Sequence, residues 1–167
     1  MAVKFEDYSY KIKADLNDVS ATWLTECGFE VAAKANDNVK MDGEAGAQLH
    51  GSYRPTRRYK DHIKVGTPLE AGYWEEFGTG EHAVQSPSRS GWWVYIDGGS
   101  GYEGDTRTYK TREEAESMAE FIRREYGKPA IATDGRDPNY TLENAFKSTM
   151  PGQEKELERR LKERFGE

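Results

Sequence analysis

Two adjacent glutamates, Glu75 and Glu76, lie between Trp74 and Phe77 and are the first residues in this sequence that could do chemistry. A glycosidase places two carboxyl groups on opposite sides of a sugar, and aromatic rings can support the substrate. On a strand, however, adjacent side chains point to opposite faces, so these neighbours make a poor acid–base pair. We expect Glu76 to be a buried or interfacial acid that pairs with an arginine or a backbone amide.

The three histidines do not have the spacing of a metal site. His50, His62 and His82 are twelve and twenty residues apart, and they fall on different expected elements. Neither an HExxH motif nor another pair of histidines on one helix occurs. The single cysteine, Cys27, excludes a disulfide within the chain and a zinc site of several cysteines, and we expect it to be a small buried hydrophobic residue on a helix. The sequence therefore predicts no metal and no cofactor.

The segment 97–105 is rich in glycine and acidic residues, a composition that could offer oxygen ligands to calcium. It lacks the spacing of an EF-hand loop and the glycine motifs of phosphate-binding loops, so a hairpin tip is favoured. Ser52, Ser86 and Ser90 are not surrounded by the GxSxG pattern of a nucleophilic serine. Because no set of nucleophile, base and orienting group is found, we expect a protein that is not an enzyme.

A basic cluster and an aromatic segment leave two other kinds of binding open. The cluster consists of Arg54, Arg57, Arg58 and Lys60 around two tyrosines, Tyr53 and Tyr59. Such interleaving can bind nucleic acid, or it can meet acidic patches on a neighbouring subunit, which we favour for a chain of net charge -6. The Trp/Tyr-rich region 92–102, which includes Trp92 and Trp93, could stack on sugar rings of a carbohydrate or cell wall.

The composition is that of a small, strongly polar domain. Of 167 residues, 35% are hydrophobic and 32% charged, and the mean hydropathy is -0.95. This is polar for a globular domain, and two explanations are open. Either part of the isolated chain is extended, or neighbouring subunits cover part of its apolar surface. An aromatic content of 12% argues against disorder throughout the chain. No signal peptide and no apolar run of about 18 residues is visible, so we expect cytoplasmic synthesis and no membrane span.

The elements that would position these residues alternate between helices and short strands. Residues 3–14 alternate like a strand with a bulge or an extended arm. An apolar stripe predicts a helix over 15–38, and residues 41–53 indicate a turn that leads into a strand. A short strand is expected at 62–66, a helical turn or strand at 71–79, and the strongest strand at 92–96.

The C-terminal half contains the clearest helix, from Thr111 to Tyr126. Thr111 and Glu114 can form a capping box, and Gly127 is suited to end the helix. Leu142, Ala145, Phe146 and Met150 suggest a short helix, followed by a separate terminal helix over 152–167. The expected fold class is α+β, with a long N-terminal helix and further helices packed on a small, mostly antiparallel sheet. We expect a single domain over 1–167.

One segment resembles a known family. Residues 71–80, which contain Tyr73, Glu76, Phe77, Gly78 and Thr79, follow Val65-Gly66-Thr67. This order resembles the signature of the tail-completion proteins, which act at the head–tail joint of long-tailed bacteriophages. The region 43–53, with Leu49 and Ser52, and the region 138–146 are also similar to segments of that family. Glu75 stands where the family has valine, and the stretch 81–133 fits a variable insertion with tryptophans.

The resemblance implies a structural virion protein in the neck, at the tail end, that assembles as a closed ring. Its partners would be further copies of itself, in a ring that we expect to be hexameric, and other phage neck and tail proteins. DNA would be a passing, non-specific neighbour. The resemblance implies no catalytic residue. Phe77, Gly78 and Thr79 would form a structural turn in which Gly78 supplies a backbone geometry barred to other residues, and Glu76 would be a fixed acid.

Overall fold

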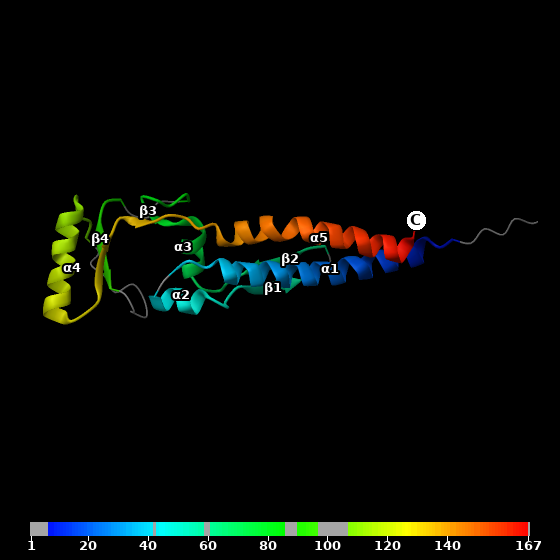
Figure 1. The fold of residues 1–167 in the computed structure, drawn as a ribbon, viewed down its shortest axis with the longest axis horizontal. Coiled ribbons are helices and arrows are strands. Elements are labelled where there is room, and N and C mark those ends of the chain that lie inside the picture. Colours follow the sequence, from blue (N-terminus) through cyan, green and yellow to red (C-terminus); the bar gives the residue numbers. More distant parts are fainter. Residues whose placement is uncertain (1–6, 42, 59–60, 86–89, 97–106, 167) are drawn as a thin grey trace, which may run out of the picture.

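Two long antiparallel helices form an arm at one end of the molecule (Figure 1). The computed structural model describes residues 7–41, 43–58, 61–85, 90–96 and 107–166. Helix α1 spans Ser9–Asn38 and helix α5 spans Thr141–Phe165. The end of α5 lies beside the beginning of α1, and an ion pair of 2.6 Å joins Arg164 to Asp15 there. We call α1 and α5 together the arm, and this end of it the arm tip.

The arm is held together by contacts that recur along both helices. The indole nitrogen of Trp23 donates to the carbonyl oxygen of Gln153 over 2.8 Å, and the Cys27 Sγ lies 3.6 Å from the Met150 Sδ. Cys27 is buried, as its apolar position on the helix predicted. Pro151 lies inside α5, where it removes one backbone N–H donor from the helical ladder. The contacts of Met150 and Gln153 with α1 lie on either side of this proline.

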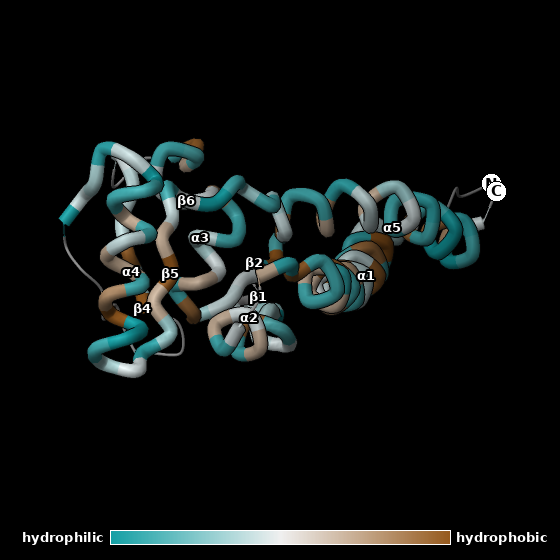
Figure 2. Tube along the Cα trace, turned by 60° about the vertical axis from the view of Figure 1, so that its left-hand side comes forward, coloured by the Kyte–Doolittle hydropathy of each residue, from teal (hydrophilic) through white to brown (hydrophobic). Residues whose placement is uncertain are grey.

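A hairpin and two short helices cover the inner end of the arm. Strand β1 (Arg54–Arg58) pairs antiparallel with β2 (Ile63–Gly66), with a register shift between Pro55 and Arg57. Helix α2 spans Gly43–Leu49 and helix α3 spans Ala71–Phe77. The main hydrophobic core lies between these elements and the arm, and it consists of Cys27, Val31, Ala35, Leu49, Tyr53 and Ala145. Figure 2 shows apolar segments of α1 turned towards α5 and the hairpin.

The chain then passes into a second lobe through the two-stranded ladder of β3 (Thr79–Gly80) and β6 (Gly135–Arg136), which we call the neck of the subunit. The two strands pair antiparallel, so the two ends of the segment 81–134 lie side by side. The lobe consists of β4 (Trp93–Ile96), α4 (Arg112–Tyr126) and β5 (Ala130–Thr133). Strands β4 and β5 are antiparallel, and α4 packs on them through Val94, Ala115, Ala119 and Ala130. This lobe lies at the opposite end of the molecule from the arm tip (Figure 1).

The fold class is α+β, as the sequence predicted, with a long N-terminal helix. The strands of the described residues form three separate two-stranded antiparallel ladders, where one small sheet was expected. The predicted helix α4 begins after Thr111, whose side chain forms the expected capping box with Glu114, and ends at Gly127 in the left-handed conformation. In the described part of the chain, no helix has the length and apolar character needed to cross a membrane.

Three expected elements differ in the structure. The strand or arm over 3–14 is wrong for residues 9–14, which are the first turns of α1, while residues 1–6 lie outside the described residues. The alternation of Tyr8, Tyr10 and Ile12 competes with a helical spacing of four through Tyr8, Ile12 and Leu16. Because extending an existing helix is easier than starting a new element, the helical pattern prevails.

The other two differences concern glycine and proline. The segment 43–53 contains helix α2 where a turn and strand were expected, and Gly46 lets this helix approach the Met41 carbonyl so closely that a Cβ would meet its oxygen at 1.8 Å. The separate helices expected at 142–150 and 152–167 are one continuous helix, α5. Pro151 does not break α5, because contacts with α1 hold the helix on both sides of it.

Candidate functional site

The residues that carry the family resemblance gather on and after α3, at the point where the arm, the hairpin and the neck meet (Figure 1). The helix has two different sides. Gly72, Glu75 and Glu76 are buried, whereas Tyr73 and Trp74 are exposed. The inner side therefore fixes α3 to the fold, and the outer side is available for contact.

Glu75 is fully buried and connects three parts of the chain. One of its carboxylate oxygens accepts hydrogen bonds from the Lys40 backbone N–H at 2.6 Å and the Asn139 Nδ2 at 2.9 Å. The hydroxyl of Thr141 also donates to this oxygen, at 3.4 Å. The other oxygen forms an ion pair of 3.1 Å with Arg136 of β6. A buried carboxylate is stable only when it is paired in this way, so Glu75 ties the end of α1 and the start of α5 to the neck.

Glu76 caps α5 from outside that helix. Its carboxylate accepts hydrogen bonds from the backbone N–H groups of Leu142 at 2.7 Å and Glu143 at 3.1 Å. The residue at the N-cap position, Tyr140, makes no side-chain capping bond and has a φ of 51°. A negative charge at this place satisfies two free donors and interacts favourably with the helix dipole. The sequence-based expectation for Glu76 named a backbone amide as a partner, and the structure supplies two.

Tyr53 lies beside the two glutamates and is 2% exposed. Burial and the neighbouring charges of Glu76 and Glu75 raise the pKa of its phenol well above the usual range, so it stays protonated. A Cβ on Gly72 would meet the Tyr53 oxygen at 3.4 Å and the Thr67 methyl group at 2.2 Å. The absence of a side chain at Gly72 therefore lets α3 pack closely over Tyr53.

Gly78 and Thr79 direct the chain from α3 into the neck. Gly78 has a φ of 75° and a ψ of -178°, a backbone geometry that glycine adopts readily and other residues rarely do, as the family resemblance implied. A Cβ here would come within 2.6 Å of the Arg136 carbonyl oxygen. Thr79 pairs with Arg136 in the β3–β6 ladder. This turn sets the direction in which the second lobe leaves the main body.

The outer side of α3 is aromatic. Tyr73 and Trp74 are 46% and 36% exposed, and the rings of Tyr73 and Phe77 lie 4.9 Å apart. Val84, 52% exposed, lies at the end of α3, where its backbone N–H donates to the Phe77 carbonyl oxygen at 2.9 Å. We call Tyr73, Trp74, Phe77 and Val84 the α3 face. Grouped exposed apolar side chains of this kind mark interaction sites.

The other predicted contact residues lie elsewhere. Arg54 begins β1 with an exposed side chain, and backbone pairing places Arg57 and Arg58 in the same strand. Lys60, Tyr59 and the loop 97–105 lie outside the described residues. Trp93 is 7% exposed and packs near Gly80, while the guanidinium of Arg112 lies 5.6 Å from the ring centre of Trp92. A sugar-stacking role requires an exposed ring, which Trp93 does not offer.

Two of the three histidines, His62 and His82, take part in separate polar contacts. His82 lies 2.8 Å from Asp137 and 3.6 Å from Asp134, and His62 lies 2.8 Å from Asp61. Nowhere in the described ranges do three or more His, Cys, Asp or Glu side chains form a group that could hold a metal ion.

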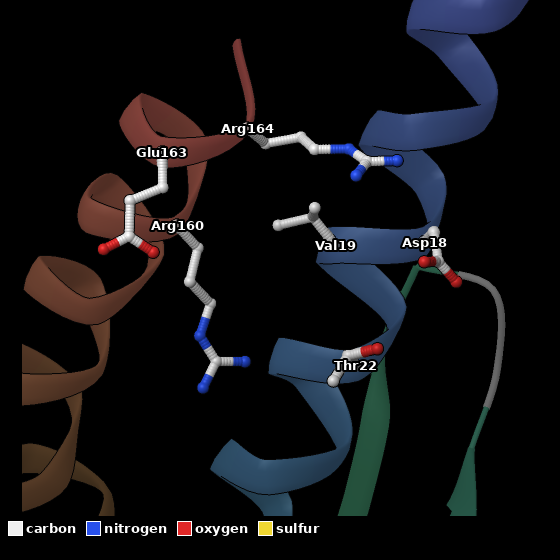
Figure 3. A pocket seen from close by; sticks show the side chains of 6 residues that line it. All are labelled: Asp18, Val19, Thr22, Arg160, Glu163 and Arg164. Atoms are coloured by element: carbon white, nitrogen blue, oxygen red, sulfur yellow. The ribbon is translucent and has the colours of Figure 1, made fainter. Parts of the chain in front are cut away.

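A shallow, open depression of about 300 Å³ lies between α1 and α5 near the arm tip (Figure 3). Its lining is polar and largely paired within the chain: Arg164 with Asp15, and Arg160 with Glu26 and Glu156. Hydrogen bonds from Arg159 and Arg160 lower the pKa of Glu156 to about 2. This network fixes the two helices against each other, which is a structural role.

Residues that the sequence analysis did not select complete the centre of the site. Asn139 donates to the carbonyl oxygen of Asn38 and to Glu75, and the side-chain oxygen of Asn36 accepts from the backbone N–H groups of Gly51 and Tyr53. Residues 36–38 close the helix that the apolar stripe predicts over 15–38. The two asparagines on either side of Asp37 are the signal in the sequence, because asparagine side chains often bond to nearby backbone groups.

Comparison with known protein families, with curated proteins and with solved structures finds no match to this chain.

Proposed function

We propose that this protein is a structural virion subunit of the tail-completion type, which finishes the tail end in the neck and joins it to the phage head. It acts by contact with copies of itself in a closed, hexameric ring and with other neck and tail proteins, and it has no catalytic role. DNA passes it without specific recognition. The proposal combines the family resemblance of residues 71–80 with the geometry of α3.

The division of α3 into two sides carries the proposal. The two carboxylates that could have acted on a substrate, Glu75 and Glu76, are occupied by donors of the chain itself. The aromatic residues of the same segment face outward. A helix of seven residues that is fixed by buried charges and exposes aromatic rings is suited to rigid docking, because little freedom is lost on binding.

Deletion of the gene from its phage tests the proposal. Electron microscopy of the lysate should show filled heads beside unattached tails, and the protein should be found in the neck of wild-type particles. Complementation with the Trp74→Ala variant should restore fewer infectious particles than complementation with Lys155→Ala, an exposed change on the arm. Intact infectious particles after deletion would refute the proposal.

The basic cluster supports the second candidate, a nucleic-acid-binding protein. Arg54 is exposed on β1, in a strand that also holds Arg57 and Arg58. This candidate predicts retention of the purified protein on DNA that falls steeply as salt rises. The structural proposal predicts weak retention at physiological salt and no effect of Arg54→Ala on it.

A further inference from the structure

Two surfaces at different places on the chain are apolar at their centres and opposite in charge at their margins. One is the arm tip and the other is the α3 face. Both combine exposed hydrophobic side chains with charged residues at their margins. Because they lie apart along the long axis of the molecule, they do not cover each other within one chain (Figure 1).

The arm tip is apolar with a basic margin. Ile12, Leu16 and Phe165 are 53%, 44% and 41% exposed. Residues 12 and 16 are four apart on α1 and continue the stripe that packs on α5 further along, and the ion pair of Arg164 with Asp15 brings Phe165 to the same end. The exposed lysines Lys11, Lys13 and Lys162 surround this patch without an ion pair in the described part of the chain.

The acids of the arm tip are largely engaged within the chain. Asp15 pairs with Arg164, and Asp18 lies near the same guanidinium. Asp7 accepts a hydrogen bond from the backbone N–H of Ser9. Pairing of these acids leaves the lysines as the charges that a partner would meet first.

The α3 face is apolar with an acidic margin. Glu70 lies three and four residues before Tyr73 and Trp74, so it shares their side of the helix, and it is exposed. Glu81, Asp134 and Asp137 flank the Val84 side, and Asp137 is 86% exposed. The nearest arginine, Arg136, is engaged by the buried Glu75. His82 contacts Asp134 and Asp137, and the Gly91 N–H donates to Glu81, so Glu70 is the acid of this margin without such a contact among the described residues.

We infer that the arm tip of one copy docks on the α3 face of the next copy. Ile12, Leu16 and Phe165 would cover Tyr73, Trp74 and Val84, and the lysines would meet the acidic margin. Since the two surfaces differ, the contact is heterologous, and repetition generates a closed ring or an open filament. The inference rests on the proposed ring and names the surfaces that build it. Every copy carries both surfaces, which favours a second copy as the occupant.

A disulfide between copies tests this contact in assembled particles. Phage that carry the Ile12→Cys and Val84→Cys changes in the same chain should give, after mild oxidation, a ladder of linked multimers on a gel without reductant. The native Cys27 is buried and should not react. Phage with either change alone serve as matched controls and should give only monomers. A double variant that yields no ladder from intact particles would overturn the inference.

Charge reversal gives an independent test. The Lys11→Glu/Lys13→Glu variant should lower the yield of infectious particles at least about tenfold, because like charges would then face each other. Adding Glu70→Lys and Asp137→Lys should recover most of this loss. The control Lys155→Glu, also exposed on the arm, should have no effect. Loss without recovery in the fourfold variant would count against the pairing.

The two proposals fail in different ways. If particles contain the protein in the neck but form no ladder, the inference is wrong and the proposed function stands. If deletion of the gene leaves particles intact, the proposed function is wrong whatever the purified protein does. If the single Val84→Cys variant alone forms linked dimers, the α3 face contacts itself in a two-fold dimer and the inference is also wrong.

Discussion

Single residues at the junction decide how the parts of this protein are joined. Glu75 and Glu76 are neighbours in sequence, yet Glu75 joins the end of α1, the neck and the Thr141 side chain, whereas Glu76 binds the first backbone N–H groups of α5. On a helix, adjacent side chains differ in direction by about 100°, so both can be buried and still reach different partners. The expectation of opposite directions, which applied to a strand, did not foresee this.

Replacement of Glu76 by glutamine should weaken the junction. The Glu76→Gln variant keeps one acceptor oxygen but loses the charge at the start of α5, so the free energy of unfolding should fall by about 1–3 kcal/mol. Urea denaturation measures the loss, and hydrogen exchange of the Leu142 and Glu143 amides locates it. Glu70→Gln, on the exposed side of α3, should change stability by less than about 0.5 kcal/mol. Equal unfolding midpoints for the two variants would contradict the capping role.

The glycines of the neck should not tolerate a side chain. Gly80 has a φ of 63°, and a Cβ there would lie 2.2 Å from the Asp134 carbonyl oxygen and 2.5 Å from Trp93. We expect Gly80→Ala to cost at least about 2 kcal/mol of unfolding free energy. Gly152→Ala is the matched control. No atom lies within 4 Å of its Cβ position in α5, so it should stabilise by up to about 1 kcal/mol. Thermal unfolding of both variants gives the comparison.

At the scale of elements, the sequence pattern predicted those helices and strands that are stabilised by residues close to them in the sequence. Helix α4 has its own cap, its own stripe and its own terminating glycine, so its bounds could be predicted within one residue. Helix α2 has seven residues including two glycines, and only its packing on Met41 and the core makes it a helix. The start of α1 and the unbroken α5 likewise depend on each other. Such elements require the tertiary structure before they can be assigned.

The C-terminal part of α5 should respond to acid through Glu156, whose partners Arg159 and Arg160 lie on the same helix. Hydrogen bonds from Arg159 and Arg160 lower its pKa from 4.5 to about 2. A group with a lowered pKa stabilises the fold above its unfolded value and loses this effect as the pH falls through its folded value. Helicity measured by circular dichroism should therefore fall between about pH 4.5 and 2 more steeply in the wild type than in Glu156→Gln. Superimposable acid transitions would contradict this.

At the scale of the whole molecule, the narrow neck separates two cores. The lobe formed by β4, α4 and β5 has its own buried cluster, while the arm, α2, α3 and the hairpin share the other. The sequence, through the family resemblance, implied a variable insertion over 81–133, where the β3–β6 ladder encloses the segment 81–134. It could not indicate the junction itself, because the partners of Glu75 come from positions 40, 136, 139 and 141.

The main body should fold without the second lobe. Replacing residues 81–134 by a short turn between Gly80 and Gly135, which are paired neighbours in the ladder, leaves the main core intact. We expect the shortened protein to keep a cooperative thermal transition and the tertiary contacts of the arm. A nuclear magnetic resonance spectrum with dispersed amide signals would verify this. A collapsed spectrum would mean that Trp93 and its lobe are required for the main body to fold.

Pro151 gives the arm a mechanical property. The carbonyl oxygen of Lys147 receives no helical N–H at that point, so α5 resists bending less there than elsewhere. Helix α1 supports α5 at this point through two contacts. Trp23 bonds to Gln153, and Cys27 contacts Met150. A force that separates the two helices would first break these contacts between α1 and α5, and α5 would then bend at Pro151. The stiffness of the arm is thus a property of the helix pair, and neither helix supplies it alone.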